Sequence, residues 1–260
     1  MPARVIAIAN QKGGVGKTTT AVSLAAGLAL AEKRTLLVDL DPQGNATTGL
    51  GVSPPGSVDS TYGVLLLDTA ARQAIAPTAI DFLKVMPSSI DLVGAEIELV
   101  NQPEREKRLS AVLGGITGDF DFMVIDCPPS LGLLTLNALA AAESVLVPVQ
   151  CEYYAMEGLA HLLRTIDLVR QRLNPGLRLE GVLLTMYDGR TSLAGQVRAE
   201  LERHLGSQIF KTVIPRNIRL TESPSHARPI FLYDLRSPGA VAYLDLTREV
   251  MSHGQQTRTG

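Results

Sequence analysis

The sequence predicts one α/β domain, a doubly wound and mostly parallel sheet with helices on both faces, and three observations favour it. The chain has 260 residues, of which 45% are apolar and 19% are charged, as in one well-packed globular domain. Short runs that are apolar throughout alternate with longer segments of helical periodicity. Strands that are apolar at every position must be covered on both faces, which is typical of parallel sheets between two layers of helices.

The expected strands and helices follow one another in regular order. Val5–Ala9 begins the sheet, a glycine-rich stretch follows, and a helix is predicted from Lys17 to about Ala31. Further strands are predicted at Thr35–Asp39, Leu83–Met86, Phe122–Asp126, Val145–Val149, Leu179–Met186 and Ile209–Val213. Further helices are predicted near residues 91–101, 104–114, 131–142, 156–172 and 191–205, and from about Pro238. Ligands of such sheets bind beyond the carboxyl ends of the strands, so functional motifs are expected there.

No linker divides the sequence, so residues 1–260 are expected to form a single domain. Gly49–Ser60 is rich in Gly, Pro and Ser and is predicted to be a surface loop, and residues 253–260 are predicted to be a frayed tail. The first strand begins almost at once, without a basic and apolar leader. The most apolar long stretch, Leu131–Val149, contains several polar residues. We therefore expect a cytoplasmic protein without a membrane span.

The stretch after the first strand has the pattern of a phosphate-binding loop. Lys12-Gly-Gly-Val-Gly-Lys-Thr18 ends like the P-loop G-x-x-x-x-G-K-[ST], but Gln11 occupies the first glycine position, and a lysine and a glycine pair are added. The backbone N–H groups of Gly13–Thr18 would point at phosphate oxygens, at the positive end of the following helix. Lys17 would reach the β- and γ-phosphates, and Thr18 would ligate Mg²⁺. A glycine turn that only joins a strand to a helix would not need this combination. The motif therefore predicts an ATPase that uses ATP and Mg²⁺.

Carboxylates follow two other predicted strands. Phe122–Asp126 is an apolar strand that ends in a carboxylate, the Walker B pattern, and Asp126 would hold Mg²⁺ through water. Asp39 and Asp41 come at the end of the second strand and so at the same edge of the sheet. A carboxylate at a strand end can also cap a helix or charge a loop, so the role of Asp39 stays open. Asp41 is predicted to position the attacking water.

The net charge of −2 conceals a difference between the two parts of the chain. Residues 1–160 carry 10 basic and 17 acidic residues, whereas residues 161–260 carry 14 basic and 9 acidic ones. Such asymmetry can mark a surface for nucleic acid or membrane, or it can be ordinary solvated surface. Cys127 and Cys151 lie 24 residues apart, which fits neither a zinc ribbon nor a disulfide framework. We expect both to be buried, reduced thiols.

Five motifs, in order along most of the chain, resemble those of the ParA/Soj family of DNA-partitioning ATPases, within the wider group that includes MinD and the nitrogenase iron protein. The motifs are Asn10–Thr20, Asp39–Asn45, Asp126–Ser130, Met186–Thr191 and Ile214–Arg219. Several of them are particular to this family rather than shared by P-loop proteins in general. The resemblance implies a single P-loop domain that hydrolyses ATP to ADP and phosphate and moves chromosome or plasmid origins.

The resemblance also implies an ATP-dependent homodimer with assigned roles at its site. The extra lysine, Lys12, would reach the phosphates bound by the partner subunit, and Gly13 would lie at the contact between subunits. Lys12, Lys17 and Asp41 are the expected catalytic residues, and Thr18 and Asp126 match the magnesium positions. The nucleotide is expected to contact Lys12, Gly13, Gly14, Val15, Gly16, Lys17, Thr18 and Thr19 through its phosphates, and Met186, Pro215 and Asn217 around the adenine.

The basic part of the chain acquires a role from the same resemblance. Arg190 and Arg219 match positions that contact DNA in Soj-like members, and residues 186–236 carry 8 basic and 5 acidic residues. The ATP-bound dimer would bind the DNA of the nucleoid without sequence preference, and a ParB-type partner would stimulate hydrolysis and release. Ala227 stands where the family pattern expects glycine, which could alter a turn, and Ile230–Leu235 looks unlike that pattern.

Two other functions remain open at the level of sequence. A MinD-like ATPase that cycles on a membrane would need a terminal amphipathic helix, whereas the chain after Val241 ends in polar residues. An electron donor like the nitrogenase iron protein would need two cysteines per subunit that face a shared cluster. Cys127, directly after Asp126, is suggestive only in its position.

Overall fold

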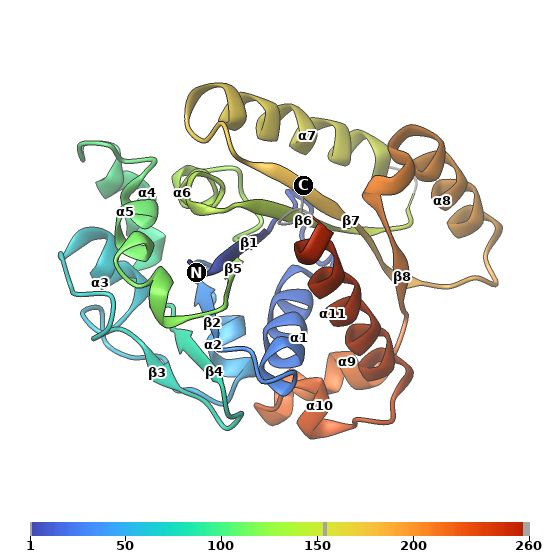
Figure 1. Cartoon of the computed structure of the whole chain (residues 1–260), viewed down its shortest axis with the longest axis horizontal. Helices are drawn as coiled ribbons and strands as arrows, with labels where there is room; N and C mark the ends of the chain where they lie inside the picture. The colour runs from blue at the N-terminus through green and yellow to red at the C-terminus, as the bar shows by residue number, and fades with distance from the viewer. Residues whose placement is uncertain (1, 153–154, 257–260) are drawn as a thin grey trace.

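Eight strands form one sheet in the computed structural model, which describes residues 2–152 and 155–256 (Figure 1). The order across the sheet is β3-β4-β2-β5-β1-β6-β7-β8, and every neighbouring pair is parallel except β3 with β4. The strands are β1 Arg4–Ile8, β2 Thr35–Asp39, β3 Ala76–Pro77, β4 Leu83–Met86, β5 Phe122–Asp126, β6 Ser144–Gln150, β7 Arg178–Tyr187 and β8 Ile209–Pro215.

The central strands are buried because helices cover both faces of the sheet, as their continuous apolar sequence predicts. β1 and β2 are buried along their whole length. β1 lies between β5 and β6, and the sheet extends from it in both directions. The loop after β1 therefore lies at the crevice where the strand order reverses, which is where doubly wound sheets bind their ligands.

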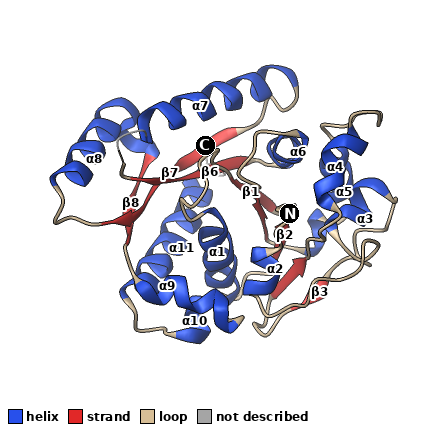
Figure 2. Cartoon of the chain, turned by 180° about the vertical axis from the view of Figure 1, so that it is seen from behind, coloured by secondary structure: helices blue, strands red, loops and turns tan. Residues whose placement is uncertain are grey.

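The helices form two layers, one on each face of the sheet (Figures 1 and 2). The first layer holds α1 Lys17–Leu30, α2 Asn45–Gly49, α9 Ile218–Glu222, α10 Ile230–Tyr233 and α11 Pro238–Gln256. The second layer holds α3 Thr61–Leu66, α4 Leu92–Leu99, α5 Arg108–Gly114, α6 Leu133–Ala141, α7 Ala155–Arg172 and α8 Ser192–Leu205. Three short 3₁₀ turns complete the described part of the chain, at Thr117–Asp119, Gly206–Gln208 and Ser223–His226.

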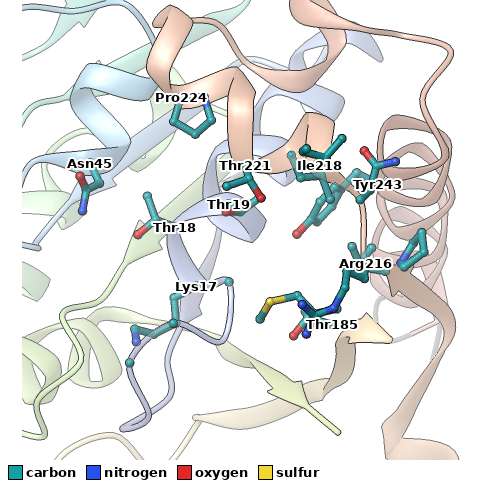
Figure 3. Close-up of a pocket in the computed structure, with 18 of the residues that line it drawn as sticks. Lys17, Thr18, Thr19, Asn45, Thr185, Arg216, Ile218, Thr221, Pro224 and Tyr243 are labelled. Carbon is teal, nitrogen blue, oxygen red and sulfur yellow. The ribbon is translucent and has the colours of Figure 1, made fainter. Parts of the chain in front are cut away.

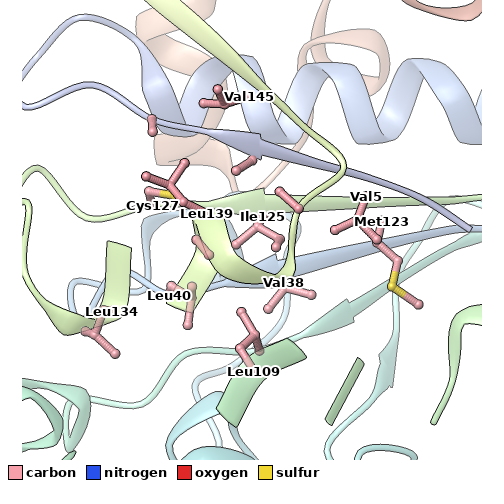
Figure 4. Packing of buried hydrophobic residues seen from close by; sticks show 14 of the residues in the cluster. Val5, Val38, Leu40, Leu109, Met123, Ile125, Cys127, Leu134, Leu139 and Val145 are labelled. Carbon is pink, nitrogen blue, oxygen red and sulfur yellow. The ribbon is translucent and has the colours of Figure 1, made fainter. Parts of the chain in front are cut away.

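Two apolar clusters make up the core, one under each layer. Successive side chains of a strand point to opposite faces, so Val5 and Ala7 belong to one cluster and Ile6 and Ile8 to the other. Figure 4 shows the first cluster, where aliphatic side chains of the strands meet those of the covering helices. The predicted doubly wound α/β fold is therefore confirmed.

Most of the predicted elements are confirmed with small shifts at their ends, but some expectations are wrong. The helix expected over residues 104–114 begins only at Arg108, because the preceding residues form turns. The frayed tail expected from residue 253 is also wrong as far as Gln256, since α11 continues to that residue; residues 257–260 lie outside the described residues.

Several short elements were not predicted from the sequence. They are β3, α2, α3, α9 and α10, none of them longer than six residues. Helices this short are not stable alone, so packing rather than local periodicity decides where they form. The atypical segment Ile230–Leu235 is an example, because it begins as α10 and buries Ile230 and Phe231 in the core.

Within the described residues, every helix is too short or too polar to cross a membrane. This finding agrees with the expectation that Leu131–Val149 is not a membrane span, because that stretch is divided between α6 and β6.

Candidate functional site

The glycine loop between β1 and α1 has the backbone shape that a phosphate site requires. Gly14 and Gly16 have φ values of 72° and 85°, which residues other than glycine rarely adopt. A Cβ built on Gly13 or Gly14 would meet no atom of the described chain within 4 Å. The loop is therefore open on its outer side, where a ligand or another subunit could approach the backbone closely.

Hydrogen bonds from the neighbouring strands hold this loop in place. The Thr185 hydroxyl at the end of β7 donates to the Val15 carbonyl at 2.8 Å. The Asn10 amide donates to the Pro148 carbonyl of β6 at 2.7 Å, and its oxygen accepts from the Lys12 N–H at 3.0 Å. The shape of the loop is thus set before any ligand binds, which lowers the entropy that binding must overcome.

Lys17, the first residue of α1, lies beneath the loop. Its Nζ donates to the Lys12 carbonyl at 3.1 Å, and the residue is buried. Burial lowers the pKa of the Lys17 ammonium, although the nearby carboxylates Asp126 and Asp41 raise it. An ammonium that is held without a direct carboxylate partner is free to pair with an anionic ligand.

Asp39 and Asp41 have different surroundings, and this difference decides the question that the sequence left open. Asp39 is fully buried and accepts hydrogen bonds from the Thr47 N–H at 2.8 Å, the Thr47 hydroxyl at 2.7 Å and the Asp41 N–H at 3.1 Å. Burial raises the pKa of Asp39 to about 6. Asp39 therefore fastens the segment that follows β2, whereas Asp41 lines the cavity described below.

Asp126, at the end of β5, has the properties of an incomplete cation site. It is completely buried, and within the described residues neither of its carboxylate oxygens has a partner in full hydrogen-bond geometry, although the nearby Thr18 hydroxyl lowers its pKa. Burial, reinforced by the neighbouring Asp39, raises the pKa of Asp126 well above its ordinary value. Buried polar atoms are nearly always satisfied, so an unpaired carboxylate at this position calls for a cation or a bound water.

These residues fit a magnesium ion that is held with a nucleotide. No group of three His, Cys, Asp or Glu residues in the described ranges could hold a metal ion by itself. Magnesium in phosphate sites usually takes one or two protein oxygens, with waters and phosphate oxygens as the remaining ligands. Thr18 lines the cavity described below, and the buried Asp126, which does not line it, lies close enough to the Thr18 hydroxyl for that group to lower the pKa of Asp126. The two residues supply that number of oxygens.

A cavity of about 720 Å³ opens beyond the glycine loop (Figure 3). It reaches from the loop to the segment after β8, with Lys17 and Thr18 at one end and Arg216 and Ile218 at the other. Met186 lines it with a positive φ of 48°, a strained conformation of the kind found at functional sites. The volume is in the range of small-molecule sites, and the cavity has one charged and one mostly apolar end.

The cavity brings together most of the predicted nucleotide contacts. Its lining includes Gly13, Gly14, Gly16, Lys17, Thr18, Thr19, Asp41, Met186, Pro215 and Asn217. Val15 is buried under the loop and does not line the cavity, so only its backbone is placed to contribute. Five further lining residues belong to the motifs that the sequence shares with the family, and Arg216 among them lies in the turn expected beside the adenine: Asn45, Pro129, Ile214, Arg216 and Ile218. The sequence did not single out the following lining residues: Thr185, Leu220, Thr221, Pro224 and Tyr243. Asn45 belongs to a motif that follows β2, whereas no local signal marks Tyr243, which α11 brings in from the far end of the chain.

Lys12 points away from this cavity. Its ammonium forms an ion pair with the Glu152 carboxylate, in the connection after β6. Both side chains are almost half exposed. The Lys12 ammonium is therefore engaged by a carboxylate of its own chain, and its role across a subunit contact stays a prediction.

Arg190 and Arg219 are exposed, but each lies against acidic residues. Arg190 pairs with Asp188 at 2.7 Å, and Arg219 pairs with Glu222 at 2.9 Å and with Asp234 at 3.4 Å. Exposed pairs of this kind contribute about 0–1 kcal/mol, so a polyanion could replace the carboxylates. The two arginines are accessible to a ligand, although neither is an isolated positive charge.

The two cysteines lie on different parts of the sheet edge and form no disulfide. Burial strongly raises the pKa of the Cys127 thiol, and burial also raises the pKa of the half-buried Cys151 thiol to about 11. Thiols react and bind metals as thiolates, and a raised pKa disfavours the thiolate of both cysteines. The expectation of buried thiols is confirmed for Cys127 and is wrong for Cys151, which is half-buried.

Comparison with known proteins shows the family to which the chain belongs. A family model described as an AAA domain matches residues 3–179. The chain is 56% identical over 248 residues to the chromosome partitioning protein ParA of Myxococcus xanthus, covering 95% of this chain and 88% of that protein. It is 55% identical over 251 residues to the sporulation initiation inhibitor protein Soj of Bacillus subtilis, covering 96% and 99%.

Solved structures show the same fold. A Mycobacterium smegmatis protein named cobyrinic acid a,c-diamide synthase, with bound ADP and magnesium, is 41% identical to this chain with a TM-score of 0.85. The match covers 97% of this chain and 96% of that chain. The glycine loop, the carboxylates at the strand ends and the two relatives that match nearly the whole chain lead to one conclusion. The chain belongs to the ParA/Soj family of chromosome-partitioning P-loop ATPases.

Proposed function

We propose that this protein is a DNA-partitioning ATPase that binds ATP and Mg²⁺ in the cavity beyond the glycine loop. The observation that carries the proposal is that a buried lysine and an open glycine loop line one end of a cavity of about 720 Å³, with the buried carboxylate of Asp126 beside Lys17 and Thr18. The phosphates would lie against the loop and Lys17, where backbone N–H groups and the helix terminus favour negative charge. Met186, Pro215 and Asn217 would surround the adenine at the other end.

Hydrolysis would depend on three residues of the chain. Thr18 and Asp126 would hold magnesium, Asp126 through water, and the ion would neutralise charge on the phosphates during phosphoryl transfer. Asp41 lines the cavity and accepts a hydrogen bond from the Gln43 N–H at 3.0 Å, which fixes its carboxylate. We assign it the orientation of the attacking water, a role that needs a positioned acceptor within hydrogen-bond reach.

ATP would also join two subunits. In this arrangement Lys12 would leave Glu152 and reach the phosphates held by the second subunit, adding positive charge where negative charge develops. Gly13 would lie at the subunit contact. The absence of any described atom within 4 Å of a Cβ at Gly13 supports this role, because the chain itself does not require glycine there.

The dimer would bind DNA through phosphate contacts and without sequence preference. Arg190 and Arg219 are the proposed contacts, and each would occur twice in a dimer, so ATP would convert a weak surface into an effective one. A ParB-type partner would stimulate hydrolysis and release the DNA. The protein would then act in the cytoplasm, on the nucleoid while ATP is bound, and would move a chromosome or plasmid origin.

The test is DNA binding measured with ATP, with ADP and without nucleotide, on DNA fragments of unrelated sequence. Binding to all fragments alike with ATP, and weak binding in the other two states, is the expected result. Equal affinity in the three nucleotide states would overturn the proposal, because the site described above would then have no control over DNA.

The two alternative functions have weaker physical support. A membrane-cycling ATPase needs an amphipathic helix that can leave the fold, but α11 buries Ala240, Tyr243, Leu246 and Val250 in the core. A cluster-carrying electron donor needs thiolates that face a second subunit, but Cys127 is completely buried and its pKa is raised.

A further inference from the structure

Helix α4 carries apolar side chains on the face that points away from the core. Ile90, Val93, Ile97 and Val100 are 67%, 62%, 76% and 50% exposed, and we call them the α4 stripe. Their spacing of three and four residues places them along one side of the helix and its two ends. The opposite side of the helix already satisfies the fold, because Leu92, Ala95 and Leu99 are fully buried in the core. Packing within the chain therefore does not explain the stripe.

The surroundings of the α4 stripe are acidic, with one cation at the end of the stripe, where Arg105 donates to the Val100 carbonyl at 3.0 Å. Residues 87–104 contain four acidic and no basic residues, namely Asp91, Glu96, Glu98 and Glu104. None of the four pairs with Lys, Arg or His within the described residues, since the nearby Arg105 and Arg108 pair with Glu106 and Asp68 instead. Hydrogen bonds from Ser57 and Ser89 hold the pKa of Asp91 below its ordinary value, so this carboxylate is charged at neutral pH.

The same helix touches the segment that follows the magnesium position. Glu96 of α4 lies so close to Gly132 that a Cβ on that glycine would fall 1.8 Å from the Glu96 Oε1 atom. This oxygen is buried and, within the described residues, accepts no hydrogen bond. Gly132 precedes α6, and the chain between Asp126 and Gly132 leads directly from the site to this contact. A displacement of α4 would therefore be transmitted to the loop after Asp126.

We propose that the α4 stripe docks a protein segment whose apolar side chains are flanked by Lys or Arg. The apolar contact would supply affinity, and the four carboxylates would select a basic partner and exclude an acidic one. In a cell the proposal rests on the function proposed above, in which a ParB-type partner stimulates hydrolysis. The contact of Glu96 with the loop after Asp126 gives such a partner a route to the site.

A second copy of this chain does not suit the stripe. Two stripes placed face to face would bring together four carboxylates from each subunit, with only Arg105 at the end of each stripe to offset them. Like charges that face each other across an interface cost free energy and suppress that pairing. Charge complementarity thus favours a basic partner over self-association at this surface.

The experiment measures binding and stimulation by the ParB-type protein of the same organism, with ATP and DNA present. The double variant Val93→Ser with Ile97→Ser removes apolar surface without adding charge, and Ile97→Lys adds a charge that would repel a basic partner. Both should bind the partner at least about tenfold more weakly and lose its stimulation. The matched control is Leu168→Ser, which changes a 52% exposed residue on α7. The control should behave like the wild type.

Further readouts separate failure of the docking surface from failure of the proposed function. Basal ATP hydrolysis, ATP-dependent dimerisation and thermal stability should be unchanged in every variant, and wild-type affinity for the partner should fall as salt rises. If the partner stimulates ATP hydrolysis equally in the wild type and in the double variant, the proposed docking surface is wrong but the proposed function stands. Loss of dimerisation in the double variant would mean that a second copy covers the stripe and would also overturn the docking surface. A wild type that neither binds nor responds to the partner would overturn both proposals.

Discussion

Each carboxylate near the phosphate loop acts according to its hydrogen bonds. Asp39 accepts three hydrogen bonds, Asp41 accepts one and lines the cavity, and Asp126 accepts none. Position at a strand end is the same in Asp39 and Asp126, whose Cα atoms are partners in neighbouring strands. The number of donors that reach each oxygen therefore separates a structural carboxylate from one that is available to a ligand.

The first prediction at the scale of residues concerns Asp126. Burial raises the pKa of Asp126, and that of Asp39 to about 6, above the ordinary value of 3.8, so the folded nucleotide-free protein retains protons that the unfolded chain releases. Its stability should therefore fall as pH rises from about 4 through 6, where the unfolded chain binds fewer protons. Asp126→Asn should make this loss shallower and stabilise the nucleotide-free protein at pH 7 by about 1–3 kcal/mol.

The measurement for Asp126→Asn is urea unfolding over a pH series, with and without ATP and Mg²⁺. The wild type should gain stability from Mg²⁺ in the presence of ATP, and the variant should not, because it lacks the carboxylate. If Asp126→Asn is less stable than the wild type at pH 7 without ligands, the protein already compensates the charge of Asp126, and the prediction is wrong.

The second residue prediction contrasts Asp41→Ala with Asp39→Ala. Asp41→Ala should bind ATP and fold normally but hydrolyse it about 10²-fold or more slowly, because a positioned acceptor for the attacking water is lost. Asp39→Ala should instead lower the free energy of unfolding by about 1–3 kcal/mol, since it leaves three donors unpaired. Single-turnover hydrolysis and urea unfolding of both variants distinguish the roles. Rapid turnover by Asp41→Ala would move the catalytic role elsewhere.

At the scale of elements, connections rather than strands carry the unusual backbone. Ala227 follows the 3₁₀ turn Ser223–His226 with a φ of 52°, in a position where the family pattern has glycine. A left-handed conformation costs an alanine roughly 1–2 kcal/mol, which glycine does not lose. The turn keeps its shape despite this substitution, because the Ala227 N–H and the Arg228 N–H still donate to carbonyls at 2.9 Å and 3.3 Å.

The strain at this turn leads to a prediction about stability. Ala227→Gly should stabilise the protein by about 0.5–1 kcal/mol. This figure is the steric strain that glycine removes, reduced by the greater conformational entropy that glycine has in the unfolded chain. The control is Gly44→Ala, whose left-handed backbone, with φ 62° and ψ 26°, is close to that of Ala227 and whose Cβ would make only ordinary contact, and which should destabilise the protein. Thermal unfolding of both proteins is the measurement. If Ala227→Gly unfolds at a lower temperature, the left-handed assignment of this turn is wrong.

The connection after β6 leads to a second prediction at this scale. Glu152 holds Lys12 away from the cavity, so Glu152→Gln should release the lysine and strengthen ATP-dependent dimerisation. Exposed ion pairs contribute about 0.2–1 kcal/mol, so the dimer should strengthen up to about fivefold. Sedimentation with ATP measures this change. As a control, Lys12→Ala and the double variant Lys12→Ala with Glu152→Gln should dimerise with equal strength. Unequal dimerisation would mean that Glu152 acts on a group other than Lys12.

At the scale of the whole molecule, the sheet separates the ligands of the proposed function. The carboxyl ends of the strands form the proposed nucleotide site, and the exposed arginines follow β7 and β8. Helix α4, which carries the stripe, lies at the opposite end of the sheet from β8 (Figure 1). The described residues contain no isolated cluster of positive charge at Arg190 and Arg219, because acidic neighbours pair with both. We therefore expect the proposed DNA binding to need two copies of the surface.

This arrangement leads to a prediction about DNA. The double variant Arg190→Glu with Arg219→Glu should bind ATP and dimerise normally but lose DNA binding, because each change occurs twice in the dimer. Replacing one arginine by alanine should make the slope of log K against log salt shallower by about one or two units and weaken all sequences alike. Electrophoretic or anisotropy titrations over a salt series provide both numbers. If dimers of the double variant bind DNA normally, these arginines do not contact DNA, and the basic excess is ordinary solvated surface.

The sequence by itself determined the parts of this protein that depend on local pattern. Continuous apolar runs such as Phe122–Asp126 predicted the strands, because a strand covered on both faces has no polar side. The glycine loop predicted the phosphate site, since few sequences allow backbone N–H groups of consecutive residues to converge. The short α10 was missed, because it forms only where Ile230 and Phe231 can be buried.

Only the tertiary structure decided which groups meet. Tyr243 reaches the cavity from α11, Lys12 pairs with Glu152 across 140 residues, and Asp126 is left without a donor. The roles of Asp39 and Asp41 were likewise separated only by the position of Thr47. The physical reason is that hydrogen bonds, burial and ion pairs depend on distances in space between residues far apart in sequence, whereas periodicity and loop composition depend on neighbours along the chain.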